Sequence, residues 1–177
     1  MKESGVVADL PTFHSPKDYL DFVASEGVTP EHLRALAQCP YDFVVVQVAG
    51  HPLTPPDVLV ALMPRELRTW NDSARLIALI RNPSMPPEEL NSAPELILPR
   101  LHVRDDHKAF EAGVALSQRS GVHEDVLIRL VSDPRATTEF RKVLARDSSH
   151  HALRERLASD RSERVRRAAE RSPVSDT

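Results

Sequence analysis

The sequence predicts an all-α fold in which short helices stack as a solenoid of about five degenerate repeats. The first reason is a recurring segment whose anchor residues are spaced 26, 31, 37 and 27 positions apart: Leu36, Leu62, Ala93, Leu130 and Leu157. The second is that the 177 residues include only five glycines, too few for a fold rich in hairpin turns. The third is the set of 15 prolines, many of which fall where helices would begin or end.

Three Ser/Thr–Pro pairs predict helix starts near the N-terminus. A Ser or Thr at the N-cap accepts a hydrogen bond from a free backbone amide, and proline is well tolerated at the next position because its missing N–H costs nothing there. The three pairs are Ser15-Pro16, Thr29-Pro30 and Thr54-Pro55. We therefore expect a helix to begin at each of these points.

The second helix of each repeat is predicted from apolar side chains at helical spacing. Such stripes are Leu76, Ile77, Leu79 and Ile80 within 72–81, then Phe140, Val143 and Leu144, and finally Val165, Ala168 and Ala169. The segment from Phe43 to Val48 is rich in valine and is also compatible with a buried strand. Its place in the repeat favours a helix.

These segments divide the chain into three parts. Residues 1–26 are expected to be an N-terminal capping segment with one helix, 27–173 the repeat array, and 174–177 a disordered tail. The two longer spacings indicate insertions in the central repeats, and Pro94 to Asp106 is the best candidate. Insertions of this kind tend to gather on one face of a repeat array.

Several short motifs resemble the leucine-rich repeat variant family, a bacterial all-helical solenoid. They are Thr-Pro-Pro-x-x-Leu, Leu-Ala-x-Asp, Val-Arg-x-Ala-x and Arg-Asn-Pro, and residues 81–90 and 157–173 match best. HEAT-like arrays remain an alternative. The resemblance, which covers roughly 27–173, implies a right-handed superhelix whose concave face binds a partner. Members of that family can carry an iron–sulfur cluster on an additional cysteine-rich segment, but this chain has only Cys39, and we predict no cluster.

Basic residues are concentrated near the C-terminus. Residues 141–171 contain ten Lys/Arg and five Asp/Glu, a net charge of +5, whereas residues 1–140 carry a net charge of −7. Arginine predominates in the basic segment, and its planar guanidinium suits recognition of carboxylate or phosphate groups. A solvated helix face is the simpler explanation, and on charge alone we favour it.

Local pairing distinguishes the arginines of the last predicted helix. Acidic residues lie four positions from Arg167 and from Arg166, and such pairs neutralise each other on a helix surface. Arg164 and Arg171 have no acidic residue at that spacing within the helix. They are the better candidates for contacts with a partner.

The sequence gives no sign of catalytic, metal or cofactor chemistry. None of the eight histidines forms the i, i+4 pair that places two imidazoles on one helix face. Glycine-rich phosphate loops and a Gly-x-Ser-x-Gly motif are absent. Cys39 falls at a predicted helix C-terminus, and we interpret it as a small buried apolar residue. An enzymatic hypothesis would require a carboxylate and an aromatic ring to converge in a groove, with Asp133 and Trp70 as candidates. Trp70 is otherwise expected in a core, with an exposed stacking or interface position as the alternative.

We therefore expect a non-enzymatic scaffold that binds a partner protein through one face of the array. The residues we select for that contact are Arg154, Arg164, Arg167 and Arg171. The alternative is binding of a nucleic-acid backbone by the same arginine-rich repeats, as in HEAT-like solenoids that grip DNA. A lone cysteine and the absence of a long apolar run predict a cytoplasmic protein with no transmembrane helix.

Overall fold

Eleven α-helices and two short 3₁₀ helices form the described part of the chain, residues 9–102 and 107–171 of a computed structural model. No strand occurs within these ranges, so the predicted all-α class is confirmed. In order, the elements are α1 (Pro16–Val23), α2 (Pro30–Leu36), α3 (Asp42–Gly50), α4 (Pro56–Ala61), α5 (Trp70–Arg81), η1 (Pro87–Ser92), α6 (Ala93–Ile97), η2 (Leu98–Arg100), α7 (His107–Gln118), α8 (Glu124–Ser132), α9 (Thr138–Asp147), α10 (His151–Ala158) and α11 (Glu163–Arg171).

Two of the three predicted N-caps are confirmed. The side chains of Ser15 and Thr29 each accept a hydrogen bond from the backbone amide three residues later, at the starts of α1 and α2. The third prediction is wrong, because Pro55 occupies the N-cap position of α4. Thr54 is instead buried, and its hydroxyl donates to the carbonyl of Val48 near the end of α3. This bond ties the start of α4 to the helix before it.

Helices α3 and α5 can be compared directly with the predictions made from the sequence. The valine-rich segment Phe43–Val48 lies within α3, so the helical prediction is confirmed and the strand alternative is wrong. The helix predicted over 72–81 begins earlier, at Trp70. Its cap is a reciprocal pair in which Thr69 accepts from the amide of Asp72, whose carboxylate accepts from the amide of Thr69.

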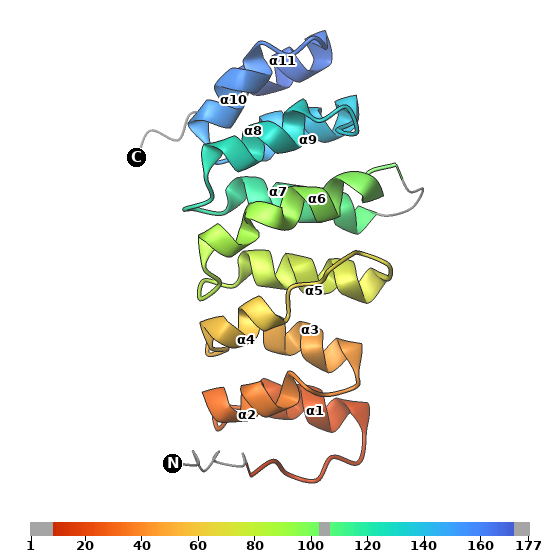
Figure 1. Cartoon of the computed structure of the whole chain (residues 1–177), viewed down its shortest axis with the longest axis vertical. Coiled ribbons are helices and arrows are strands. Elements are labelled where there is room, and N and C mark those ends of the chain that lie inside the picture. The colour runs from red at the N-terminus through yellow and green to blue at the C-terminus, as the bar shows by residue number, and fades with distance from the viewer. Residues whose placement is uncertain (1–8, 103–106, 172–177) are drawn as a thin grey trace.

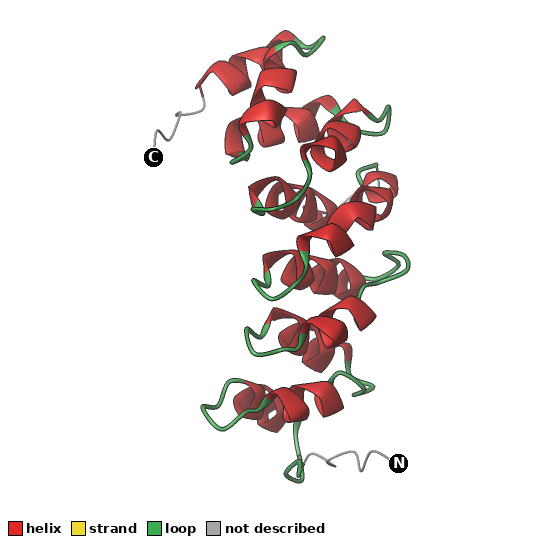
Figure 2. Ribbon diagram, turned by 60° about the vertical axis from the view of Figure 1, so that its left-hand side comes forward, coloured by secondary structure: helices red, strands yellow, loops and turns green. Residues whose placement is uncertain are grey.

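The helices lie in two layers along the long axis of the molecule. In one layer α1, α3, α5, α7, α9 and α11 follow one another, each in contact with the next (Figure 1). In the other, α6, α8 and α10 are in contact in that order, and α2 and α4 continue the row toward the N-terminal end (Figure 2). Extensive contacts therefore join helices that are close in sequence.

Apolar side chains fill the space between the layers in two clusters. The larger runs from Ala49 to Val165 and the smaller, N-terminal one from Val23 to Val58, and the partly buried Leu62 packs against both. The predicted stripes of the second helices belong to this core except for Val143, which is half-buried and outside both clusters. Their fully or nearly fully buried members are Leu76, Ile77, Leu79, Ile80, Phe140, Leu144 and Val165.

The helix ends in the first layer are joined by hydrogen bonds to backbone carbonyls. Asn82, 1% exposed at the end of α5, donates from its amide to the carbonyls of Ala49 (2.9 Å) and His51 (2.8 Å) at the end of α3. Its own side-chain oxygen accepts from the amide of Ser84. Carbonyls in the last turn of a helix have no partner within that helix, so each bond satisfies a group that would otherwise be left open.

The same arrangement continues toward the C-terminus. Arg119, which follows α7, donates to the carbonyls of Pro83 and Met85, beyond the end of α5. Ser148, which follows α9, donates its hydroxyl to the carbonyl of Ser117 at 3.0 Å. Four successive helices, α3, α5, α7 and α9, are thus connected along one edge.

The predicted insertion from Pro94 to Asp106 is largely part of the second layer. Pro94 is the second residue of α6, and Ile97, Leu98 and Leu101 are buried in the larger core cluster. Prolines divide residues 87–100, which include the first part of this segment, into η1, α6 and η2 instead of one regular helix. The remainder of the segment, 103–106, and the predicted tail, 174–177, lie outside the described residues.

We expect Asn82→Ala to lower the free energy of unfolding by about 1–3 kcal/mol, because one buried and one partly buried carbonyl lose their donor. Asn91→Ala is the matched control, since Asn91 is exposed and its side chain forms no hydrogen bond within the described residues; we expect a change below about 0.5 kcal/mol. Urea unfolding followed by circular dichroism measures both. Equal effects of the two substitutions would contradict the role given to Asn82.

We expect Gly113→Ala to destabilise the contact between α7 and α9. A Cβ at residue 113 would lie 2.3 Å from Cζ of Phe140, a fully buried ring that meets Phe110 edge-to-face. The predicted loss is about 1–3 kcal/mol by thermal or urea unfolding. Gly27→Ala, where a Cβ would meet nothing within 4 Å, should change stability by less than about 0.5 kcal/mol.

Candidate functional site

A basic groove lies between α9 and α11, at the C-terminal end of the stack. Its volume is about 450 Å³, and both helices turn cationic side chains toward it. The groove residues are Lys142, Arg146, Arg164, Arg167, Ala168 and Arg171. The α9–α11 contact that forms it depends on the buried side chains of Phe140, Leu144 and Val165 beneath.

Three of the groove cations have nearby acidic partners. Arg167 pairs with Glu163 one turn earlier in α11, as the sequence spacing predicted, and both side chains are about 64% exposed. Lys142 and Arg146 also form ion pairs within α9, with Glu139 and Asp147, and each pair has one half-buried member. Exposed pairs of this kind contribute roughly 0–1 kcal/mol, so their cations can exchange partners at little cost.

Arg164 and Arg171 are different. Both are exposed, and within the described residues neither forms an ion pair or a hydrogen bond. The other pairing predicted in α11, Arg166 with Glu170, is wrong, because Arg166 donates to the backbone carbonyl of Asp160. That contact turns Arg166 toward the preceding loop.

The four arginines selected from the sequence divide between the two layers. Arg164, Arg167 and Arg171 line the basic groove together. Arg154 lies on α10, is half-buried and is not a groove residue. The structure therefore brings three of the four together and adds Lys142 and Arg146 from α9.

A buried ion pair that the sequence analysis missed joins α9 to the loop after α10. Arg141 is 4% exposed and Asp160 is 8% exposed, and the guanidinium donates to both carboxylate oxygens at 2.8 and 3.3 Å. Arg141 also donates to the carbonyl of Ala136. Its position carried a usable signal, because residue 141 shares a helix face with the apolar Leu144 and Ala145.

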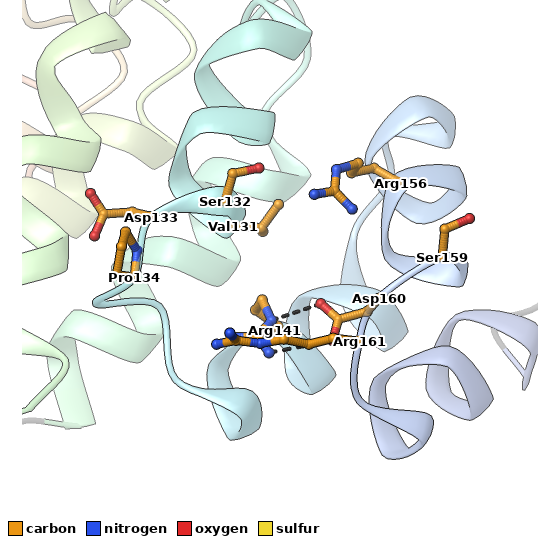
Figure 3. Close-up of a pocket in the computed structure, with 9 residues that line it drawn as sticks. All are labelled: Val131, Ser132, Asp133, Pro134, Arg141, Arg156, Ser159, Asp160 and Arg161. Carbon is orange, nitrogen blue, oxygen red and sulfur yellow. Dashed lines mark hydrogen bonds and ion pairs between the residues drawn. The ribbon is translucent and has the colours of Figure 1, made fainter.

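This ion pair forms part of an arginine pocket with a volume of about 380 Å³, shown in Figure 3. The pocket lies between the loop that follows α8 and the loop that follows α10. Its residues are Val131, Ser132, Asp133, Pro134, Arg141, Arg156, Ser159, Asp160 and Arg161. It shares no residue with the basic groove.

Both carboxylates of the arginine pocket are held in the ionised form. Burial alone would raise the pKa of Asp160, but hydrogen bonds from Arg141 and from the amide of Ser162, with the nearby positive charge, lower it overall. Arg135 donates two side-chain hydrogen bonds and one backbone hydrogen bond to Asp133, which lowers the pKa of that carboxyl to about 2. Neither carboxylate is therefore an uncompensated charge near neutral pH.

The enzymatic hypothesis built on Asp133 and Trp70 finds no support in their placement. Asp133 lines the arginine pocket, while Trp70 begins α5, several helices away along the stack (Figure 1). The expectation that Trp70 lies in a core is also wrong. Its side chain is 65% exposed, and the ammonium of Lys108 lies 5.3 Å from its ring centroid.

Metal-ligating side chains do not gather within the described ranges. No group of three or more His, Cys, Asp or Glu side chains in residues 9–102 and 107–171 is arranged to hold an ion. Cys39 is a free, half-buried thiol that packs against the N-terminal core cluster, beyond the end of α2.

We expect Asp160→Asn to lower the free energy of unfolding by about 3–5 kcal/mol, because it leaves the buried Arg141 charge without a counter-ion. Asp57→Asn removes the carboxylate of an exposed pair with Arg34 and should cost less than about 1 kcal/mol. Urea unfolding at neutral pH compares them. Because the folded-state pKa of Asp160 is lowered, the difference between wild type and Asp160→Asn should persist above about pH 4 and shrink as pH falls below it.

Comparisons with models of protein families, with characterised proteins and with solved structures give no match for this chain. In the described residues, no helix combines the length and the apolar character needed to cross a membrane. The function must therefore be inferred from the geometry of the chain's own side chains.

Proposed function

We propose that the protein is a non-enzymatic scaffold whose basic groove binds an acidic segment of a partner protein. The observation that carries this proposal is the convergence of five cationic side chains from α9 and α11, two of which, Arg164 and Arg171, make no polar contact within the described residues. A carboxylate can accept charge-assisted hydrogen bonds from these cations, and a guanidinium binds a carboxylate in a bidentate manner.

The architecture that presents the groove is, in this proposal, a right-handed α-solenoid of about five repeats related to the leucine-rich repeat variant family. The contacts between successive helices within each layer support it, as does the one-to-one placement of the recurring sequence segments on α2, α4, η1–α6, α8 and α10. In such an array each repeat contacts only its neighbours, which leaves long surfaces open to a partner.

The charge distribution favours a protein segment over a long nucleic acid. The groove belongs to the part of the chain with a net charge of +5, but residues 1–140 have a net charge of −7. A short acidic peptide contacts only the groove, whereas a long polyanion would also extend along the acidic part. Only 5% of residues are aromatic, which leaves few rings for stacking on bases.

Binding of a nucleic-acid backbone is the second candidate, and the same five cations favour it. Phosphate contacts make affinity fall steeply with salt, because bound counterions are released from the nucleic acid. A labelled 20–30 base-pair duplex (roughly two to three helical turns) tested at low salt distinguishes the two candidates. Duplex binding tighter than peptide binding would favour the nucleic-acid candidate.

We expect Arg164→Glu/Arg171→Glu to weaken binding of a fluorescein-labelled acidic peptide rich in glutamate by about tenfold or more, because two attractive contacts become repulsive. The matched control is Lys17→Glu/Arg65→Glu, which changes net charge equally at exposed sites far from the groove. Fluorescence polarisation should show less than about a twofold effect for the control. Equal losses in the two variants would contradict a localised site.

A pull-down from nuclease-treated lysate with the same three proteins then identifies the partner. A protein retained by wild type and by the control variant, but lost with Arg164→Glu/Arg171→Glu, is the expected result. Thermal unfolding should differ little among the three chains, because the substituted side chains are exposed and the one ion pair lost, between Lys17 and Asp21, is also exposed.

A further inference from the structure

The arginine pocket has properties that the scaffold role does not use. Its buried cation, Arg141, carries five N–H donors, and three of them are taken by Asp160 and the carbonyl of Ala136. Two donors of a guanidinium that is only 4% exposed therefore remain at the wall of the pocket. A buried donor without an acceptor is costly, so this wall favours a ligand or solvent molecule that supplies acceptor oxygens.

Two further guanidinium groups reach the same space. Arg156 enters from α10 and Arg161 from the loop that follows it, as Figure 3 shows. Both are exposed at the pocket rim, and neither forms an ion pair or a hydrogen bond within the described residues. Arg161 is nonetheless close enough to Asp160 to help lower the pKa of that carboxyl.

The pocket has an excess of two positive charges. Asp160 is neutralised by Arg141 and Asp133 by Arg135, which leaves Arg156 and Arg161 uncompensated. The hydroxyl group of Ser132 points toward Arg156 across the space, as Figure 3 shows, and it has no hydrogen-bond partner within the described residues. An ideal ligand would therefore be a compact dianion with several acceptor oxygens.

We propose that the arginine pocket binds a phosphate monoester group. A phosphate monoester carries a charge of about −1.5 to −2 at pH 7 and three acceptor oxygens, which match the charge excess and the donors from three guanidiniums and the hydroxyl of Ser132. A carboxylate has one charge and two oxygens, too few to occupy these donors. The site is independent of the basic groove, so either can fail without the other.

The test is a titration of the full-length, ¹⁵N-labelled chain with phenyl phosphate, with benzoate as the matched carboxylate ligand, followed through the arginine Nε–H resonances. We expect saturable shifts with phenyl phosphate, binding at least about tenfold weaker for benzoate, and stronger binding as pH rises from about 5 to 7.5, through the second phosphate pKa. Absence of saturation by about 10 mM phenyl phosphate, or equal binding of benzoate, would overturn the proposal.

Two matched double variants test whether phenyl phosphate binds in the arginine pocket or in the basic groove. Arg156→Gln/Arg161→Gln should weaken phenyl phosphate binding at least about tenfold, while Arg164→Gln/Arg167→Gln in the basic groove should change it less than about twofold. The reverse pattern would overturn the proposal. The acidic-peptide assay should respond in the opposite way, so failure of this site and failure of the basic groove are distinguishable.

A last comparison identifies the source of the phosphate. Free phosphoserine and a seven-residue peptide with phosphoserine at its centre are titrated in the same way. Tighter binding of the peptide indicates a phosphorylated protein, and equal or weaker binding indicates a free phosphate ester. Both results require the pocket to bind the phosphate group itself, so phosphoserine binding that is unaffected by Arg156→Gln/Arg161→Gln would overturn the proposal.

Discussion

The structure depends on one constraint: its helices are short, and the backbone N–H and C=O groups at their ends have no hydrogen-bond partners within the same helix. Most have between five and ten residues, so much of the backbone of each lies in its first or last turn. The open carbonyls at the end of α3 are capped by Asn82, and those beyond α5 by Arg119. Because the cap comes from the next helix of the layer, burial of apolar stripes and completion of backbone hydrogen bonds require the same neighbour.

This dependence changes at α11, the last described helix. It contacts α9 and α10 through Val165 and the partly buried Ala168 and Ala169, so one face is used by the core. Beside this contact Arg164, Arg167 and Arg171 lie toward α9, and with Lys142 and Arg146 of that helix they line the basic groove. Near the same end of the stack, Arg141 and Asp160 hold in place the loops after α8 and α10, which border the arginine pocket.

Local signals allowed much of the fold to be predicted, and non-local ones accounted for most of the errors. Ser15 and Thr29 were identifiable because capping needs only the following residues, and the stripe at 76–80 because its period is local. Thr54 was misassigned because its partner, Val48, lies in the preceding helix. For the basic groove, spacing alone identified Arg164 and Arg171 as unpaired, but the contribution of Lys142 and Arg146 depends on how α9 meets α11. Arg141 was counted with the solvated cations because its partner is 19 residues away.

The placement of Trp70 has a practical consequence. It is the single tryptophan of the chain, exposed at the start of α5 and in contact with Lys108 of α7. Its emission therefore reports the junction between two successive levels near the middle of the stack. Far-ultraviolet ellipticity, in contrast, averages over all helices. If unfolding followed by tryptophan emission and unfolding followed by ellipticity have the same midpoint, the stack unfolds as one cooperative unit; different midpoints indicate that it unfolds from its ends inward.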